Sequence, residues 1–318
     1  MTRPQITLSA LIIAAAATAS YVLVVAPAWA QAAHEETSGA DPLAEARRGI
    51  AALGGHWDAA AFTRTASLYT EVHRDVEWPG VRAAETISYG SDPQQHMRLF
   101  APEQGFSEPG PVFVFLHGNG LGDSDQVVPA SDELIYGNVG KLGARYGGIG
   151  ITANYRHADV PGERAGAEDI AAVVAWITEH IASYGGDPNT IVLLANSDGA
   201  RHAAMYLFDS SIQPAPGPGF AAAILSSGTF ATSLPFIERL IEDYDGVRTP
   251  LALWSAQYDP APVEISTAEV YAAICRKYQD CPSMAQLPGH NHVSQVMSLG
   301  SDDMSVQTEL LRFYHTVR

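Results

Sequence analysis

A serine, an aspartate and two histidines stand where they could together carry out nucleophilic catalysis. Ser197 lies in the segment LLANSDGARHA, where an apolar run meets a helical one. Asp259 follows the apolar run PLALWSA, and His290 and His292 follow the run SMAQLPG. A serine hydroxyl becomes a nucleophile when a histidine accepts its proton and an acid orients that histidine. These residue types therefore predict acyl transfer through Ser197, provided that the fold brings the side chains together.

The elements that would position these residues alternate along the chain from residue 111 onward. Most of the apolar runs lack period-two alternation, which is typical of parallel strands buried on both faces. The predicted strands are residues 111–117, 148–155, 190–196, 221–227, 250–256 and 283–289. The predicted helices are residues 162–184, a helix following Ser197, and residues 234–244, 266–278 and 305–317. This alternation predicts an α/β fold with a mostly parallel central sheet and helices on both faces.

The N-terminal part of the chain has a different composition. Arg3, a following apolar run and the Ala28-Trp29-Ala30 site are typical of a secretory signal peptide that is cleaved after Ala30. The alternative is an uncleaved membrane anchor, because the apolar run is nearly long enough to span a bilayer, although polar residues interrupt it. We therefore expect export to the periplasm or the medium, with no stable membrane anchoring after cleavage.

Three segments are expected along the chain. Residues 1–30 are the signal peptide, residues 31–80 a leader with a short N-terminal helical arm, and residues 81–318 the catalytic domain. Within the arm, helical composition marks residues 42–53 and 59–73. Two extended segments around a Gly-Ser-Asp-Pro turn at residues 90–93 predict a hairpin at the start of the catalytic domain.

Composition and charge exclude several classes of protein. The chain has 318 residues, 47% of them hydrophobic, which is enough for one large core. Its net charge of −17 argues against binding to nucleic acid.

The two cysteines, Cys275 and Cys281, form either a small disulfide loop or two buried thiols. Neither this pair nor the His-Asn-His stretch is a usual set of metal ligands, so we predict no metal and no cofactor.

The chain order serine, aspartate, histidine is that of the α/β-hydrolases and differs from those of the chymotrypsin and subtilisin folds. The sequence also resembles the carboxylesterase and hormone-sensitive-lipase-like group of that fold, over about residues 85–318. The resemblance rests on Asn154-Tyr155-Arg156, Asp169, Trp176 and the segment YGGDPNTI at residues 184–191. The segment YGSDPQQHMRLFAP, upstream of FLHGNG, looks like the first strand of small secreted esterases related to feruloyl esterases.

This resemblance implies roles for the candidate residues. Ser197 is the nucleophile, Asp259 orients the imidazole, and His292 is the general base and then the general acid. His292 is favoured over His290 because Val293-Ser294 follows it, and in this group an apolar residue and often a serine follow the catalytic histidine. The implied oxyanion-hole donors are the backbone N–H groups of Asn119, Gly120 and Asp198.

The turn around Ser197 departs from the usual G-x-S-x-G pattern. Ala195 replaces the first glycine and adds one methyl group where the strand and the helix pack closely. Asp198, directly after the nucleophile, would carry a carboxylate close to the developing oxyanion. The N-terminus of a helix, together with pairing to Arg201 or His202, would stabilise that negative charge. A further departure is Asn119, which stands where the group has glycine.

The expected function is that of a secreted serine carboxylic ester hydrolase acting on a small-molecule or polymer-fragment ester. The alternatives are another acyl-transfer enzyme of the same fold (peptidase, amidase or acyltransferase) and a non-catalytic binding protein. No long insertion follows the strand at residues 221–227, so any cover over the site must come from the arm or from residues 127–138. The expected lining of the substrate pocket is Gly118, Leu121, Phe230, Leu234 and Val293.

Overall fold

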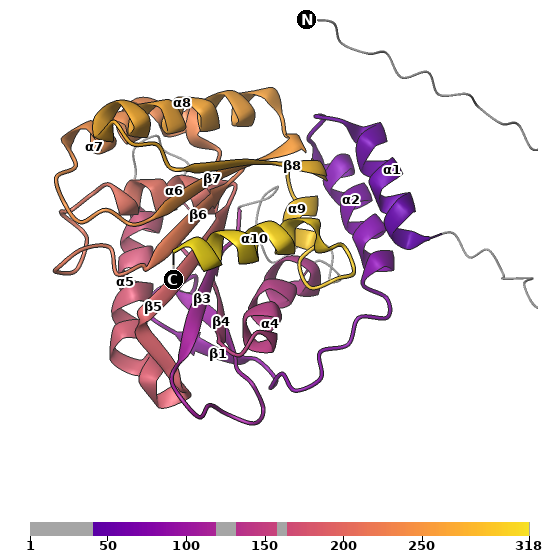
Figure 1. Cartoon of the computed structure of the whole chain (residues 1–318), viewed down its shortest axis with the longest axis horizontal. Helices are drawn as coiled ribbons and strands as arrows, with labels where there is room; N and C mark the ends of the chain where they lie inside the picture. The colour runs from indigo at the N-terminus through magenta and orange to yellow at the C-terminus, as the bar shows by residue number, and fades with distance from the viewer. Residues whose placement is uncertain (1–40, 119–131, 158–163, 318) are drawn as a thin grey trace, which may run out of the picture. The chain divides into compact units, whose positions relative to one another are not determined.

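An eight-stranded sheet forms the centre of the molecule, with the strand order β1-β2-β4-β3-β5-β6-β7-β8 (Figure 1). This computed structural model describes residues 41–118, 132–157 and 164–317. β1 pairs with β2, and β2 with β4, in antiparallel fashion, and the other neighbours are parallel. The strands are β1 (Glu85–Ser88), β2 (His96–Phe100), β3 (Gly110–Leu116), β4 (Ile149–Ala153), β5 (Gly186–Asn196), β6 (Ala222–Ser226), β7 (Leu251–Tyr258) and β8 (Ser283–Asn291).

Helices cover both faces of the sheet, because alternate residues of the buried strands point to opposite sides. On β5, Leu193 and Ala195 pack toward one face, with α5 (Ala165–His180), α6 (Asp198–Leu207), α7 (Leu234–Asp243) and α8 (Ala261–Tyr278). Val192 and Leu194 pack toward the other face, with α4 (Asn138–Arg145) and α10 (Met304–Thr316). The shorter helical elements are η2 (Asp132–Gly137), η3 (Ile181–Tyr184), η4 (Phe230–Ser233) and α9 (Ser294–Met297). The predicted α/β architecture with a mostly parallel sheet is confirmed.

Two of the longer helices differ clearly from the sequence prediction. Helix α8 begins at Ala261, five residues before the predicted start, and follows Pro260 directly. Helix α4 lies where none was predicted, since glycine is a poor helix former and α4 contains Gly140 and Gly143. A Cβ on Gly143 would lie 3.1 Å from the Cα of Gly150 on β4. These glycines therefore allow α4 to approach the sheet closely.

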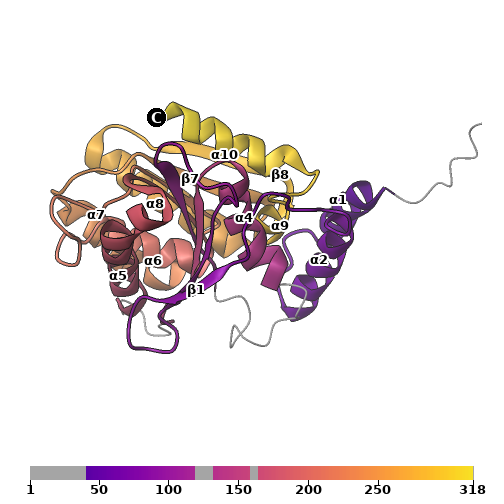
Figure 2. The same ribbon diagram turned by 90° about the horizontal axis from the view of Figure 1, so that it is seen from below.

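The arm forms two helices, α1 (Pro42–Leu53) and α2 (Ala59–Val72), nearly as predicted. Asp41 and Asp58 cap their N-termini, each accepting a backbone N–H bond from the first turn. Both views show α1 and α2 side by side, next to α9 (Figures 1 and 2). The predicted signal peptide and most of the leader lie outside the described residues. Among the helices that the structure describes, none is long and apolar enough to cross a membrane.

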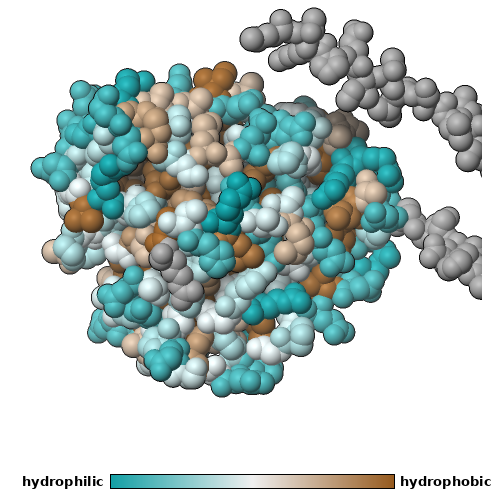
Figure 3. Space-filling view, in the orientation of Figure 1, coloured by the Kyte–Doolittle hydropathy of each residue, from teal (hydrophilic) through white to brown (hydrophobic). Residues whose placement is uncertain are grey.

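The surface combines hydrophilic and apolar side chains, while most large apolar side chains are buried. Hydrophilic side chains cover much of the face seen in Figure 3, with apolar ones scattered among them.

At the end of α8, Cys275 and Cys281 form a disulfide, which is the first of the two predicted alternatives. Gln279 lies inside this small loop in a left-handed conformation that ends the helix.

Candidate active site

Ser197 occupies a sharp turn between β5 and α6. Its backbone dihedrals are φ 58° and ψ −122°, a region that residues other than glycine rarely adopt. The surrounding sheet holds this conformation, since the Ser197 N–H donates to the Ser226 carbonyl oxygen over 3.1 Å. A strained strand–turn–helix of this kind presents the serine Oγ at the carboxyl end of the sheet. The turn is therefore a nucleophile elbow in geometry, despite the missing first glycine.

The elbow needs glycine on one side only. A Cβ on Gly199 would lie 2.7 Å from the carbonyl oxygen of His117, so no larger residue fits there without displacement. Ala195 is fully buried between β3 and β6, and its methyl group is accommodated. Gly118 approaches the nucleophile itself, because a Cβ there would lie 2.9 Å from Ser197 Oγ.

The structure brings Ser197, His292 and Asp259 into one hydrogen-bonded chain. Ser197 Oγ lies 2.9 Å from His292 Nε2, and His292 Nδ1 lies 2.9 Å from Asp259 Oδ1. The three residues stand at the carboxyl ends of β5, β8 and β7, and each is at most 7% exposed. Asp259 accepts bonds only, so it selects the tautomer with the proton on Nδ1 and leaves Nε2 as an acceptor for the serine proton.

His290, the alternative histidine, lies in a different polar cluster. Its Nε2 is 2.8 Å from Ser305 Oγ, and its Nδ1 is 3.2 Å from Ser294 Oγ. Asp303 lies 3.8 Å from the same Nε2. Side chains two residues apart on an extended strand share a face, but the turn after β8 separates these two imidazoles. Of the two histidines, His292 is the one that meets Ser197.

Sequence reasoning missed the residues that hold Asp259 in place. Asp259 Oδ2 accepts bonds from the Ala256 N–H over 2.7 Å and from the Ser227 hydroxyl over 2.6 Å. Gln295 Nε2 donates to Ser227 Oγ and, over 2.9 Å, to the His292 carbonyl oxygen. The sequence predicts Ser227 only as the last residue of a buried strand. No residue next to it in the sequence indicates a hydrogen bond to a partner 32 residues away.

Asp198 has a carboxylate that is held beside the elbow. The Thr229 hydroxyl donates to its Oδ1, and Arg201 Nε lies 3.2 Å from the same oxygen. Burial raises the pKa of this carboxyl, but the Thr229 bond and the Arg201 charge outweigh it and lower the pKa below its ordinary value. The structure therefore shows the pairing of Asp198 with Arg201, one of the two partners (Arg201 or His202) that the sequence analysis proposed. The Asp198 N–H lies in the first turn of α6, where N–H groups have no intrahelical acceptor.

The remaining site predictions are only partly covered by the structure. Asn119, Gly120 and Leu121 lie outside the described residues, so the loop donors of the oxyanion hole stay a prediction. Phe230 is fully buried in the main core, and Leu234 packs partly buried against it. Val293 belongs to the cluster beneath the arm. Their role as pocket lining also stays a prediction.

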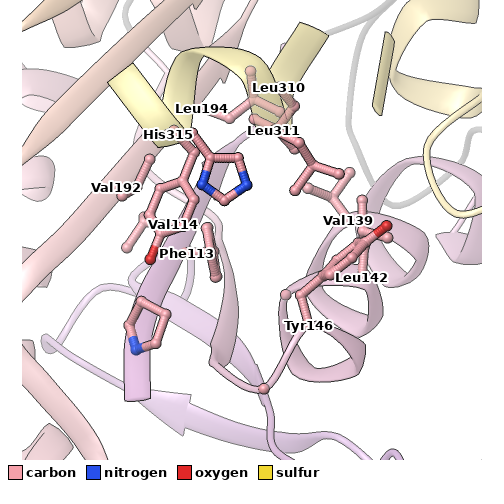
Figure 4. Close-up of a pocket in the computed structure, with 14 residues that line it drawn as sticks. Phe113, Val114, Val139, Leu142, Tyr146, Val192, Leu194, Leu310, Leu311 and His315 are labelled. Atoms are coloured by element: carbon pink, nitrogen blue, oxygen red, sulfur yellow. The ribbon is translucent and has the colours of Figure 1, made fainter. Parts of the chain in front are cut away.

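A separate apolar cavity of about 360 Å³ lies beneath α10 (Figure 4). Its wall comes from β3, α4, β5 and α10, and includes Phe113, Leu142, Leu194 and Tyr314. Of the predicted lining residues that the structure describes (Gly118, Phe230, Leu234 and Val293), none belongs to this cavity. It is therefore distinct from the predicted acyl pocket.

A buried histidine on α6, His202, should make the stability of the folded protein depend on pH. Burial and then the Arg201 charge lower the pKa of the His202 imidazole from 6.5 to about 3. Below pH 6.5 the His202 imidazole binds a proton in the unfolded chain, whereas in the folded chain it stays neutral down to about pH 3. The unfolding free energy therefore falls as the pH drops from 6.5 toward 3. Between pH 7 and pH 4.5 the wild type should lose about 2 kcal/mol more unfolding free energy than His202→Gln. Urea unfolding at both pH values measures this, and equal losses in the two proteins would contradict it.

A serine on a strand–helix elbow, with an acid after β7 and a histidine after β8, places this chain in the α/β-hydrolase fold. Comparison with known proteins agrees. The family model described as "Carboxylesterase family" matches residues 96–242. Esterase B1 of Culex pipiens is 30% identical over 149 residues, which are 45% of this chain and 27% of that protein. The para-nitrobenzyl esterase of Bacillus subtilis is 29% identical over 163 residues, or 46% of this chain and 31% of that protein.

Solved structures extend the likeness over most of the chain. Esterase B from Lactobacillus rhamnosis has a TM-score of 0.63 at 18% identity, covering 86% of this chain and 96% of that one. A thermostable esterase from Pseudomonas putida has a TM-score of 0.60 at 14% identity, with the same coverage of 86% and 96%. At such identities the likeness defines the fold. Sequence and fold thus agree on the α/β-hydrolase esterases as the group that this chain resembles, and closeness to feruloyl esterases stays a prediction.

Proposed function

We propose that this protein is a secreted serine carboxylic ester hydrolase that works through an acyl-enzyme on Ser197. The observation that carries the proposal is the chain of contacts from Ser197 Oγ to His292 Nε2 and from His292 Nδ1 to Asp259, each 2.9 Å long. This arrangement suits acyl transfer, in which one group must remove a proton and later return it. The match to the carboxylesterase family favours an ester bond over other acyl bonds.

The acylation step follows from these contacts. His292 Nε2 accepts the Ser197 hydroxyl proton as Oγ bonds to the carbonyl carbon of the ester. The imidazolium that forms keeps its Nδ1–H on Asp259, whose negative charge stabilises it. The tetrahedral intermediate then collapses, the bond to the alcohol oxygen breaks, and His292 gives its Nε2 proton to the leaving alcohol. Water repeats the sequence on the acyl-enzyme, releasing the acid and restoring Ser197.

The negative oxygen of the tetrahedral intermediate needs donors that are already in place. The Asp198 N–H at the start of α6 is one donor in this proposal, and the N–H groups of Asn119 and Gly120 are the expected others. The Asp198 carboxylate is drawn toward Thr229 and Arg201, which limits its repulsion of the developing charge. Each lost donor would lower kcat by about 10²- to 10³-fold.

The proposed substrate class is a small-molecule ester or an ester fragment of a polymer, met in the periplasm or outside the cell. Export is supported by the positive residue, the apolar run and the Ala-Trp-Ala site of residues 1–30. The name of the Bacillus subtilis relative states an action on a para-nitrobenzyl ester, which makes aryl and benzyl esters reasonable first substrates. No cofactor is required by this mechanism.

A panel of p-nitrophenyl acyl esters tests the proposal. Ser197→Ala should lower kcat by at least about 10⁴-fold, because the nucleophile is removed. Ser183→Ala is the matched control, since Ser183 is exposed and its hydroxyl contacts only the nearby His180 carbonyl among its described bonds. Protein recovered from the periplasm or medium should begin at Gln31 by N-terminal sequencing. Turnover that does not depend on Ser197 would overturn the proposal. Labelling of Ser197 by a fluorophosphonate without ester turnover would favour the other acyl-transfer enzymes.

A further inference from the structure

The turn between the two arm helices lies against the loops that carry Asp259 and His292. The Trp57 ring centroid is 4.9 Å from that of His292, and the ring planes meet at 63°. A Cβ on Gly55 would lie 3.1 Å from the backbone oxygen of Asp259. Two residues of the arm, which are remote in sequence from the last two strands, thus approach two members of the catalytic chain directly.

A hydrogen bond joins the arm to the residue that precedes His292. Thr65 Oγ1 on α2 accepts from Asn291 Nδ2 over 2.9 Å and donates to the Ala61 carbonyl oxygen over 2.8 Å. Asn291 Oδ1 in turn accepts from the N–H groups of Val293 and Ser294 over 3.3 and 3.0 Å. The Asn291 amide therefore spans the turn that carries His292, and Thr65 fixes the orientation of that amide.

Apolar packing completes the contact between the arm and this turn. Val293 and Met297 are buried in one cluster with arm residues that include Ile50 and Phe62. The His73 ring nitrogen lies 2.7 Å from the Met297 carbonyl oxygen. The segment that positions His292 is thus held by the arm and, through the Gln295 side chain, by Ser226 and Ser227 at the end of β6.

We propose that Trp57 and Thr65 are positioning residues that act through His292. The inference rests on the proposed function. Edge-to-face packing of aromatic rings favours one mutual orientation, so Trp57 restrains rotation of the imidazole. Thr65 restrains the loop behind it through Asn291. Together they keep Nε2 within hydrogen-bonding distance of Ser197, and small displacements of catalytic groups are costly to the rate.

Replacement of two tryptophans tests the role of Trp57. Trp57→Ala should lower kcat by about threefold to tenfold with KM nearly unchanged, and Trp57→Phe should restore most of the rate. Trp78→Ala is the matched control, because Trp78 belongs to the same N-terminal segment and packs on Lys141 and Arg145 instead. Equal kcat values for Trp57→Ala and Trp78→Ala would overturn the inference. A rise in KM alone would also overturn it, because Trp57 would then bind substrate.

A second pair of variants covers the case in which Trp57→Ala does not fold. Thr65→Val keeps the shape of the side chain but removes the acceptor for Asn291, and should lower kcat by about threefold to tenfold. Thr70→Val is the control, since the Thr70 hydroxyl likewise donates to a carbonyl oxygen four residues back on α2. Thr65→Ser should retain the wild-type kcat. Equal kcat values for Thr65→Val and Thr70→Val would contradict the role of Thr65.

The failure of this inference and that of the proposed function can be told apart. Absence of Ser197-dependent ester cleavage in the wild type is a failure of the proposed function alone. The contact can then be measured without turnover, through the NMR signals of isotope-labelled histidine assigned with His292→Gln. The His292 signals should shift in Trp57→Ala and stay in place in Trp78→Ala. Unchanged His292 signals in Trp57→Ala would overturn the inference.

Discussion

Replacing His292 by asparagine should lower kcat for ester hydrolysis by at least about 10⁴-fold, whereas His290→Asn should leave most of kcat intact. His292 Nε2 lies 2.9 Å from Ser197 Oγ, and asparagine has no group there that takes up a proton near neutral pH. His290 contacts Ser294 and Ser305 instead. Steady-state kinetics on the two purified variants, with the same p-nitrophenyl ester, measures the difference.

The His290 variant also serves as a control for folding. Because His290 is buried and bonded to two hydroxyl groups, its loss should cost about 1–3 kcal/mol of stability. His292→Asn can therefore be compared with a variant that is perturbed to a similar degree, two residues away. Loss of turnover in folded His290→Asn, with turnover kept in His292→Asn, would reverse the assignment of the two histidines.

Asp259→Asn should lower kcat by about 10⁴-fold while the protein stays folded. Asp259 Oδ2 accepts from the Ala256 N–H and the Ser227 hydroxyl, so an asparagine would keep its oxygen at that position. Its NH₂ group would then face His292 and could donate only to an unprotonated Nδ1. The proton would move to Nε2, where it points at Ser197 and blocks the histidine from acting as a base. Kinetics on the folded variant measures the loss.

Asp303→Asn is the matched control for this prediction. Asp303 is also buried near a histidine, His290, and it accepts bonds from Arg47 and Tyr69 of the arm over 3.1 and 3.2 Å. Its replacement should weaken the protein without comparable loss of kcat. A folded Asp259→Asn with a tenth or more of the wild-type kcat would show that Asp259 does not set the tautomer of His292.

The arm gives the site a support that is remote in the sequence. Many of its contacts are with the turn after β8 and with α9, where His292, Val293 and Met297 lie. An arm that was only an appendage could be shortened without effect on catalysis. The contacts of Trp57 and Thr65 instead link the arm to the orientation of one imidazole.

The sequence by itself determined the architecture and the catalytic candidates. Apolar runs without alternation, separated by helical segments, predict parallel strands, because burial on both faces removes the polar positions. The order of Ser197, Asp259 and His292, each after such a run, predicts that their side chains meet at one edge of the sheet. These signals are local, since each depends on a few consecutive residues and their spacing.

Only the tertiary structure decided which groups hold the candidates in place. Ser227 meets Asp259 across 32 residues, Trp57 meets His292 from the arm, and Thr65 meets Asn291 across 226 residues. A serine at a strand end or a threonine within a helix has the same local appearance whether or not it contacts a catalytic loop. Such contacts arise when the sheet places the ends of β6, β7 and β8 side by side and the arm packs over the turn after β8. They depend on the packing of distant segments, which no local pattern of residues records.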